Sequence, residues 1–459
     1  MNPMTESACA LDQELERYPL SFTQEWFITL DQGDDGGTFG SRFIMFTPLR
    51  VTGRVDLAVL QGALDDVIAR HELLRTLVVR DADQPYQLVC PPCPVPLEVT
   101  DLPPVTGKSR DLVARELIAE ALKGKVSARQ VPMVRARLCR FDDRDSVLFL
   151  TVHHSVSDGW SMQVIVRDLS TFYAARSAGT PAALPPVRQY REYAQWQRDR
   201  AADPAEDGAP RYWQDKLHGA REFTMPNDHG HPESYSRSYS LYAHKVEADV
   251  MAGASALASA SRSTLFTVLL AACYVLAHQI TGATDLAIRA FTAGRDEPEF
   301  QDTMGLFLNV VPFRTSLDGC TSFRDILTRT RDTFIDSVTH ELPVNVIEQS
   351  FPDFVKSRED TRTSQFILQS FQSQFDDTDV PIAEGARKIY DRLEETSEPG
   401  DIPSGMVWNL SMMLTGELGG GVIFNPEEFD ESTVAGWAAG LRRILAGAVA
   451  DPDVDWKTL

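Results

Sequence analysis

The 459-residue sequence has little of what marks secreted or membrane proteins. It contains only six cysteines, and they are scattered. No basic residue precedes Arg17, so the charged start of a signal peptide is missing. The longest apolar run, Phe266–Ala277, is well short of the ~18 residues that a membrane span needs. We therefore expect a cytoplasmic protein with reduced thiols and no membrane association, in which Phe266–Ala277 forms a buried helix.

Basic residues are also scarce. The chain has 44 Lys and Arg against 66 Asp and Glu, a formal net charge of −22. Nucleic acid and anionic membranes would be repelled by such a surface, so neither is an expected partner. A local basic patch for one acidic partner remains compatible with this charge.

Several motifs of common enzyme classes are missing. There is no GxSxG nucleophile elbow, and Gly107-Lys108-Ser109 lacks the earlier glycine of a phosphate loop. Histidine and cysteine are dispersed, which predicts no metal site. We expect no bound cofactor either.

The sequence does have the composition of a folded protein, with 43 % hydrophobic and 24 % charged residues. Its length predicts two sizeable lobes or one large α/β unit. Apolar periodicity predicts mixed strands and helices. The expected strands are Arg42–Leu49, Gln87–Cys90, Val147–Val152 and Asp285–Ala290, and the expected helices are Leu57–Glu72, one around Ile165–Tyr173, two within Val250–Ile280, Phe323–Val338 and Glu431–Ala448.

Composition also predicts where lobes and loops fall. Stretches rich in Ala, Pro and Gly or in acidic residues lie within 176–215, so we expect an N-terminal lobe at 1–180, a linker at 181–215 and a C-terminal lobe at 216–459. The acidic, aperiodic Asp376–Gly405 predicts a long exposed loop, and Gly419–Gly421 predicts a hairpin turn.

The most informative residues follow the apolar run Val147–Val152. There the chain reads His153-His154-Ser-Val-Ser-Asp158-Gly159, at an expected strand-to-helix junction. His154 has the pKa range of a general base, and Gly159 permits close backbone approach. An equally good interpretation is a pair of core histidines with Asp158 capping the next helix. Spacing alone leaves both open.

This segment resembles the HHxxxDG signature of nonribosomal peptide synthetase condensation domains, members of the chloramphenicol acetyltransferase-like superfamily. Arg70–Thr76 matches their RHExLRT motif in full. Weaker resemblances to other family motifs follow in the family's order: Ser21–Ile28, Tyr190–Trp196, Tyr212-Trp213, Ala293-Gly294-Arg295, Gly305–Arg314 and His340–Pro343.

The resemblance implies an α/β fold of two acetyltransferase-like lobes, arranged as a V-shaped pseudo-dimer with a tunnel between them. It implies that His154 promotes attack on a thioester carried by the phosphopantetheine of a carrier protein. His153, Asp158 and Gly159 would support the site, with Asp158 paired to Arg75 and backbone near Gly159 stabilising the oxyanion. The tunnel candidates are Ser157, Trp160 and Asn309.

No phosphopantetheine attachment site or adenylation segment is found, so we expect a free-standing protein that takes its donor from a separate carrier protein. We expect a monomer, because the two lobes would already form the pseudo-dimer. The acceptor is either a diffusible amine or alcohol or a second carrier-bound group. Resemblance to free-standing members of enediyne pathways favours an ester. The alternatives are an inactive recruitment module, an epimerase-type relative and a coenzyme A-dependent acyltransferase.

Overall fold

The computed structural model describes residues 15–121, 123–202, 208–231, 238–371, 380–388, 397–399, 405–412 and 416–459. The chain forms two compact units. The first comprises Met1–Ala202, Ala293–Leu308 and Ser373–Asp391, and the second comprises Asp203–Thr292, Asn309–Gln372 and Arg392–Leu459. Two later segments thus belong to the first unit, whereas the predicted lobes are contiguous in sequence.

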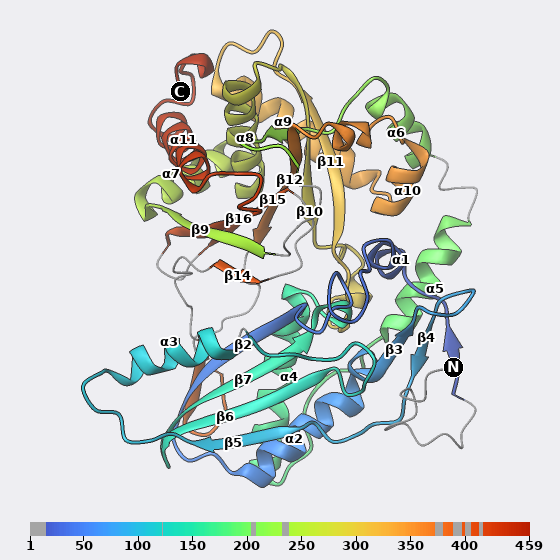
Figure 1. The fold of residues 1–459 in the computed structure, drawn as a ribbon, viewed down its shortest axis with the longest axis vertical. Helices are drawn as coiled ribbons and strands as arrows, with labels where there is room; N and C mark the ends of the chain where they lie inside the picture. The colour runs from blue at the N-terminus through green and yellow to red at the C-terminus, as the bar shows by residue number, and fades with distance from the viewer. Residues whose placement is uncertain are drawn as a thin grey trace. The chain divides into compact units, whose positions relative to one another are not determined.

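The first unit is built on a five-stranded sheet in the order β13-β2-β7-β6-β5 (Figure 1). A smaller sheet has the order β1-β4-β3. The strands are β1 (Arg17–Tyr18), β2 (Ile44–Thr52), β3 (Thr76–Val79), β4 (Tyr86–Val89), β5 (Leu97–Asp101), β6 (Val134–Asp142), β7 (Asp145–His153) and β13 (Gly385–Lys388). The helices are α1 (Phe22–Thr29), α2 (Leu57–Arg70), α3 (Arg110–Ala121), α4 (Gly159–Ala178) and α5 (Tyr190–Ala201).

Strand β7 is the centre of this sheet, as its apolar run predicts. It pairs with β2 on one side and β6 on the other, and Val147–Leu150 are all buried. Helix α3 packs against one face through Leu117 and Ile118, which cluster with Phe149 of β7. Because β7 is fixed on both sides, the point where it ends is fixed as well.

The second unit contains one larger sheet in the order β11-β10-β12-β15-β16-β9-β14, with β8 also paired to β12. Its strands are β8 (Thr224–Pro226), β9 (Ser238–Val246), β10 (Asp285–Thr292), β11 (Asn309–Ser316), β12 (Thr363–Phe371), β14 (Ser397–Pro399), β15 (Met406–Met412) and β16 (Leu418–Phe424). Its helices are α6 (Gly208–Leu217), α7 (Ala248–Ala260), α8 (Leu265–Thr281), α9 (Phe323–Thr339), α10 (Val344–Ser350) and α11 (Glu431–Ala450).

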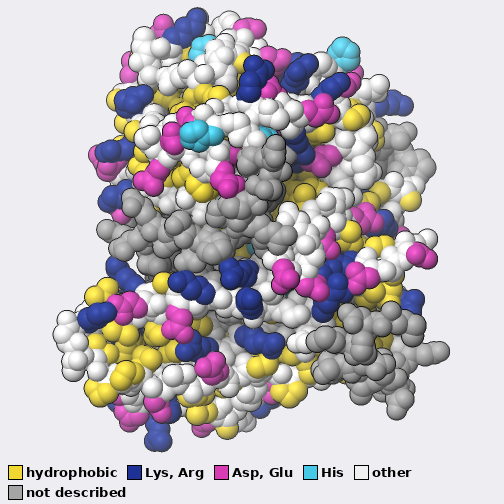
Figure 2. Space-filling view, viewed as in Figure 1, with side chains coloured by type: hydrophobic (Ala, Val, Ile, Leu, Met, Phe, Trp, Pro, Cys, Tyr) yellow, Lys and Arg dark blue, Asp and Glu magenta, His cyan; other side chains and the backbone are white. Residues whose placement is uncertain are grey.

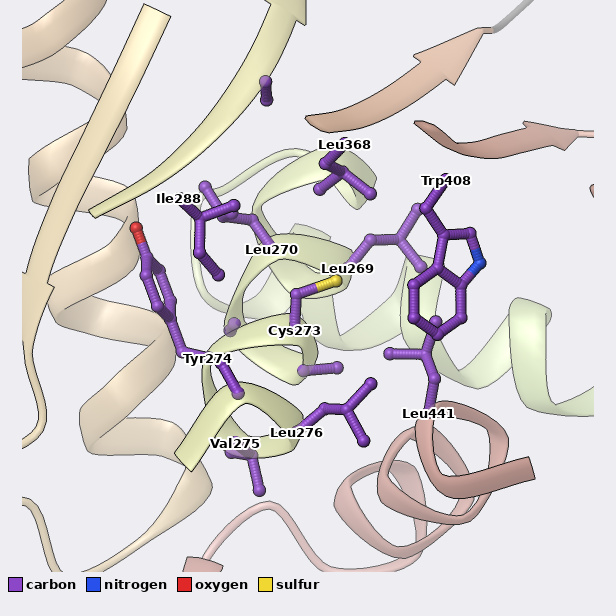
Figure 3. Packing of buried hydrophobic residues seen from close by; sticks show 14 of the residues in the cluster. Leu269, Leu270, Cys273, Tyr274, Val275, Leu276, Ile288, Leu368, Trp408 and Leu441 are labelled. Atoms are coloured by element: carbon purple, nitrogen blue, oxygen red, sulfur yellow. The ribbon is translucent and has the colours of Figure 1, made fainter. Parts of the chain in front are cut away.

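Helix α8 forms the core of the second unit. The predicted buried helix is confirmed for Thr267–Ala277, whose side chains are all buried, whereas Phe266 is partly buried. Cys273 of α8 lies among Leu368 of β12, Trp408 of β15 and Leu441 of α11 (Figure 3). Within the described residues no single helix is long and apolar enough to cross a membrane; α7 and α8 meet that test only jointly, and they are bent by 106° at their break.

Two local predictions are wrong. The segment Asp376–Gly405, predicted as a loop, contains β13, whose Ala386 is buried and pairs with Val51 of β2. A four-residue edge strand is too short to show periodicity, and its partner lies far away in sequence. The rest of that segment lies outside the described residues except 380–384, the short strand β14 and Gly405.

The triglycine Gly419–Gly421 forms part of strand β16, not a hairpin turn. A Cβ at Gly420 would lie 2.1 Å from the Asn409 carbonyl oxygen, so close packing of neighbouring strands requires glycine at this position. A Cβ at Gly421 would lie 2.3 Å from Leu241 Cδ1 and would displace that side chain.

Charged side chains of both signs are interspersed on the visible face of the molecule (Figure 2). Ion pairs link neighbouring elements within each unit, such as Arg140 with Asp101 at 2.7 Å and Arg324 with Asp453 at 2.7 Å. Acidic side chains on this face are thus mixed with basic ones instead of gathered in one patch (Figure 2).

Candidate functional site

The predicted site lies at the junction between β7 and α4. Strand β7 ends at His153, a short 3₁₀ turn covers His154–Val156, and α4 begins at Gly159. Asp158 caps this helix, since its Oδ1 accepts a hydrogen bond of 2.7 Å from the Ser161 amide. The whole signature is thus folded into one tight turn.

His153 is a structural residue of this turn. Its side chain is fully buried, with Nε2 3.0 Å from the Gly40 carbonyl oxygen and Nδ1 2.7 Å from Ser155 Oγ. A carbonyl oxygen only accepts, so the proton is on Nε2. Burial lowers the pKa of His153 to about 4. The ring is therefore neutral and already occupied on both sides.

His154 is held in the opposite tautomer. Its Nδ1 lies 2.7 Å from the Ser157 carbonyl oxygen, so Nδ1 carries the proton and Nε2 carries the lone pair. Burial lowers the pKa of His154 below its ordinary value, against a smaller opposite effect of the Asp158 charge. A neutral imidazole with a lone pair on Nε2 has the protonation state that a general base requires.

Two aromatic rings surround His154. The Phe43 ring stacks on the imidazole with centroids 4.6 Å apart and planes 9° apart. Phe27 of α1 meets the imidazole at an interplanar angle of 67°, with centroids 6.3 Å apart. The orientation of the imidazole is thus set by ring packing as well as by its hydrogen bond.

Asp158 binds Arg295, and the predicted pair between Asp158 and Arg75 is wrong. Arg295 Nη2 lies 3.2 Å from Asp158 Oδ1, and the Phe307 amide donates to Oδ2 at 3.1 Å. The Arg295 side chain is almost fully buried, and its guanidinium lies 3.9 Å from the centroid of the Phe307 ring. Asp158 therefore ties the start of α4 to the segment Ala293–Leu308.

Arg75 is occupied elsewhere. Its guanidinium donates to the carbonyl oxygens of Cys90 and Ile68, and it lies 4.0 Å from Glu72. The RHExLRT segment supports α4 through its other residues.

The contact with α4 is made at Asp168, which is fully buried. Arg70 Nε and His71 Nε2 each lie 2.8 Å from Asp168 Oδ2, and Arg167 Nε donates to Oδ1 at 2.8 Å. The motif thus fixes the helix that follows the histidines, not the histidine turn itself.

Residues of the other recognised motifs contact the segment Ala293–Leu308, to which Asp158 is also bound. The Tyr190 hydroxyl donates to the Leu306 carbonyl at 2.6 Å and accepts from Ser21 Oγ at 2.7 Å. Ser161 Oγ lies 2.8 Å from the Gly305 carbonyl oxygen and 2.9 Å from Arg295 Nη2. Sequence reasoning missed Ser161 and Arg295 as site supports; the Ala293-Gly294-Arg295 resemblance was the available signal, but it names no partner.

The three tunnel candidates all have structural hydrogen bonds. Ser157 is buried and donates through Oγ to the His153 carbonyl at 3.1 Å. The Trp160 indole donates to the Gln301 carbonyl at 2.8 Å. Asn309 lies in the second unit, where Nδ2 donates to Glu341 at 2.8 Å. Contact of any of them with substrate stays a prediction.

Gly159 begins α4, so its amide is one of the first helical N–H groups, which lack partners within the helix.

In the part of the chain that the structure describes, no three His, Cys, Asp or Glu side chains are grouped as a metal ion would require.

Comparison with known proteins identifies relatives over nearly the whole chain. The family model described as Condensation domain matches residues 14–459. Chondramide synthase cmdD of Chondromyces crocatus is 33 % identical over 411 residues, which cover 87 % of this chain but only 10 % of that protein. The chain therefore spans a small part of this much longer relative.

Two solved structures are similar over their full length. SgcC5 of Streptomyces globisporus, in complex with (R)-(-)-1-(2-naphthyl)-1,2-ethanediol and sucrose, has a TM-score of 0.87 and 33 % identity, with 95 % of this chain and 100 % of that chain covered. The X-domain from teicoplanin biosynthesis, in complex with OxyB, has a TM-score of 0.74 and 25 % identity, with 100 % and 98 % covered.

Proposed function

The chain belongs to the condensation-domain family of natural-product biosynthesis and has its chloramphenicol acetyltransferase-like fold, and from that premise we propose that it is an acyltransferase acting on a carrier-bound thioester. The donor is an acyl or aminoacyl group on the phosphopantetheine of a carrier protein. The acceptor is an alcohol or an amine, and the product is an ester or an amide. The enzyme itself binds no cofactor in this proposal.

The single observation that carries the proposal is the state of His154. Its Nδ1–H is committed to the Ser157 carbonyl at 2.7 Å, so Nε2 is available to accept a proton. Its lowered pKa keeps it neutral at physiological pH. His153 has no such freedom, because both of its nitrogens are hydrogen-bonded.

The reaction is a proton-coupled acyl transfer. His154 Nε2 takes the proton of the acceptor O–H or N–H while the acceptor atom attacks the thioester carbonyl carbon. In the tetrahedral intermediate the carbonyl oxygen carries negative charge, which the Gly159 amide at the start of α4 can stabilise. The C–S bond then breaks, and the pantetheine thiolate takes the proton back from the imidazolium.

An alcohol is the favoured acceptor. SgcC5, the 33 % identical relative, was solved with an aryl-1,2-ethanediol, which offers hydroxyl groups and no amine. An alcohol also needs a general base more than an amine does, because an amine with an ammonium pKa of about 8 is partly deprotonated at neutral pH. A histidine held in the tautomer of a base therefore suits an alcohol acceptor better than an amine.

A recruitment role is the second candidate, since the chain is similar to an X-domain that forms a complex with OxyB. The His154 arrangement favours catalysis over this role, because a protein that only recruits needs no histidine held with its lone pair available.

The test is a mass-spectrometric assay of an aminoacyl carrier protein incubated with the enzyme and a mixed panel of alcohols and amines. We expect loss of the acyl group from the carrier and a new ester. His154→Ala should abolish the product, whereas His229→Ala, at an exposed histidine, should keep it.

Other outcomes assign other functions. An amide product would leave the proposed mechanism unchanged and identify an amine as the acceptor. Turnover with an acyl coenzyme A only would identify the enzyme as a coenzyme A-dependent acyltransferase. Carrier binding with no transfer to any acceptor, carrier-bound ones included, supports recruitment and overturns the proposal.

A further inference from the structure

Phe43 is bound to the His154 turn by its backbone as well as by its ring. It lies one residue before β2, and its carbonyl oxygen accepts a hydrogen bond of 2.8 Å from the His154 amide. The next residue, Ile44, pairs with His153 in the sheet. The backbone of Phe43 is therefore held in place beside the imidazole of His154.

Phe27 packs against both Phe43 and His154. Its ring meets Phe43 at 63° with centroids 5.8 Å apart, an edge-to-face geometry that aromatic pairs prefer. Phe27 belongs to α1, whose first turn is capped by Ser21, the same residue that bonds Tyr190. The stack on His154 is thus supported from a second element of the first unit.

Hydrogen bonding alone does not fix the imidazole completely. The bond from Nδ1 to the Ser157 carbonyl sets the tautomer and one direction in the ring plane, but the ring can still tilt about the N–O axis. A flat ring 4.6 Å away and 9° from parallel blocks this tilt. It also keeps water away from one face of the imidazole.

We propose that Phe43 is a positioning residue for His154, whose stacked ring holds the imidazole plane and so aims the Nε2 lone pair in one direction. This inference rests on the proposed role of His154 as the base.

The neighbouring charges do not account for the environment of the imidazole. His153 is neutral, and the Asp158 carboxylate is engaged by Arg295, while α1 and the start of β2 present the uncharged rings of Phe27 and Phe43. Burial is the larger influence on the His154 pKa and lowers it. Removing the stacked ring should therefore raise this pKa towards its ordinary value.

The test compares Phe43→Leu with Phe43→Tyr and with a matched control, Phe46→Leu. Phe46 lies on β2 but packs against the α3 cluster around Leu117 and Phe149. Phe43→Leu should lower kcat about tenfold or more, because misplaced reacting groups lose rate steeply. KM for the acyl carrier should stay within about twofold, since Phe43 acts through His154 and not on the carrier. Phe43→Tyr should keep most of the wild-type kcat, because it keeps an aromatic ring at this position. Phe46→Leu should leave kcat unchanged.

A second measurement needs no substrate. ¹⁵N NMR titration of His154, assigned by its loss in His154→Ala, should give a higher pKa in Phe43→Leu than in the wild type and in Phe46→Leu. The acidic inflection of the pH–rate profile of Phe43→Leu should move to higher pH together with this pKa. An unchanged titration and an unchanged kcat in Phe43→Leu would overturn the inference. A shifted titration in a protein that transfers no acyl group would uphold the positioning and refute the proposed function.

Discussion

The Asp158 carboxylate accepts from Arg295 Nη2 at 3.2 Å, although the two residues are 137 positions apart. Asp158 also caps α4, and Arg295 donates to the Phe300 and Thr303 carbonyls at 3.1 and 2.8 Å. One buried ion pair therefore fastens the start of the helix after the histidines to a segment from late in the chain. It gives the Asp of the signature a structural task that does not require contact with substrate.

Breaking this pair should destabilise the protein. Asp158→Ala leaves the Arg295 charge buried without its partner, and such losses run to about 3–5 kcal/mol. The free energy of unfolding from urea titrations measures the effect. In a double-mutant cycle, Asp158→Ala and Arg295→Met together should cost less than the sum of the two single changes.

The matched control is Arg75→Ala, which should be additive with Asp158→Ala because the two side chains do not share a contact. Additivity of Asp158 with Arg295, or strong coupling of Asp158 with Arg75, would contradict this assignment.

A side chain at Gly305 should disrupt the same network. A Cβ there would lie 2.2 Å from Tyr190 Cδ2 and 2.4 Å from Phe307 Cε2. We expect Gly305→Ala to destabilise the protein by about 1–3 kcal/mol, the usual effect of overpacking a core.

Gly436→Ala is the control for this change. Gly436 lies inside α11 and has no atom within 4 Å of its would-be Cβ, so alanine there should stabilise by about 0.5–1 kcal/mol through helix propensity. Equal melting temperatures for both variants would show that the packing at Gly305 is looser than described.

Protein stability should fall with acid because of His153. Its pKa is about 4 in the folded state, against an ordinary value of 6.5, so between these values the unfolded chain binds a proton that the folded chain does not. The contribution is complete above pH 6.5 and is lost as the pH falls towards 4, by up to about 3 kcal/mol at 1.36 kcal/mol per pKa unit.

Urea unfolding at pH 7, 6 and 5 checks this prediction. His153→Gln should be less stable at pH 7 but should lose less stability between pH 7 and pH 5 than the wild type. His229→Gln, at an exposed position, should keep the wild-type slope. A wild-type slope in His153→Gln would assign the acid sensitivity to other groups.

Several elements of both units can be predicted from the sequence because their signals are local. Alternation and apolar runs predict α2, α8 and β7 to within a few residues, and Asp158 is a recognisable helix cap. The interpretation that Asp158 caps the next helix and the interpretation that His154 is a base turn out to be compatible. His153, in contrast, is the core histidine that spacing alone allowed.

The failures concern contacts between distant segments. Arg75 and Arg295 are both arginines of recognisable motifs, and no local pattern tells which of them reaches Asp158. Strand β13 is defined by its pairing with the distant β2, and β16 pairs with the distant β9 as well as with its sequence neighbour β15. The stacking of Phe43 on His154 is likewise created by the register between β2 and β7, which no single segment encodes.

In the proposed reaction His154 acts as the base in acyl transfer from a carrier-bound thioester. The most direct test is a single-turnover measurement with a preloaded acyl carrier and an alcohol acceptor, comparing the wild type with His154→Ala and His154→Gln. We predict that both variants fold normally, bind the acyl carrier and react about 10²–10⁴-fold more slowly, the usual contribution of a general base. A variant that folds, binds and reacts within a few-fold of the wild-type rate would contradict the claim.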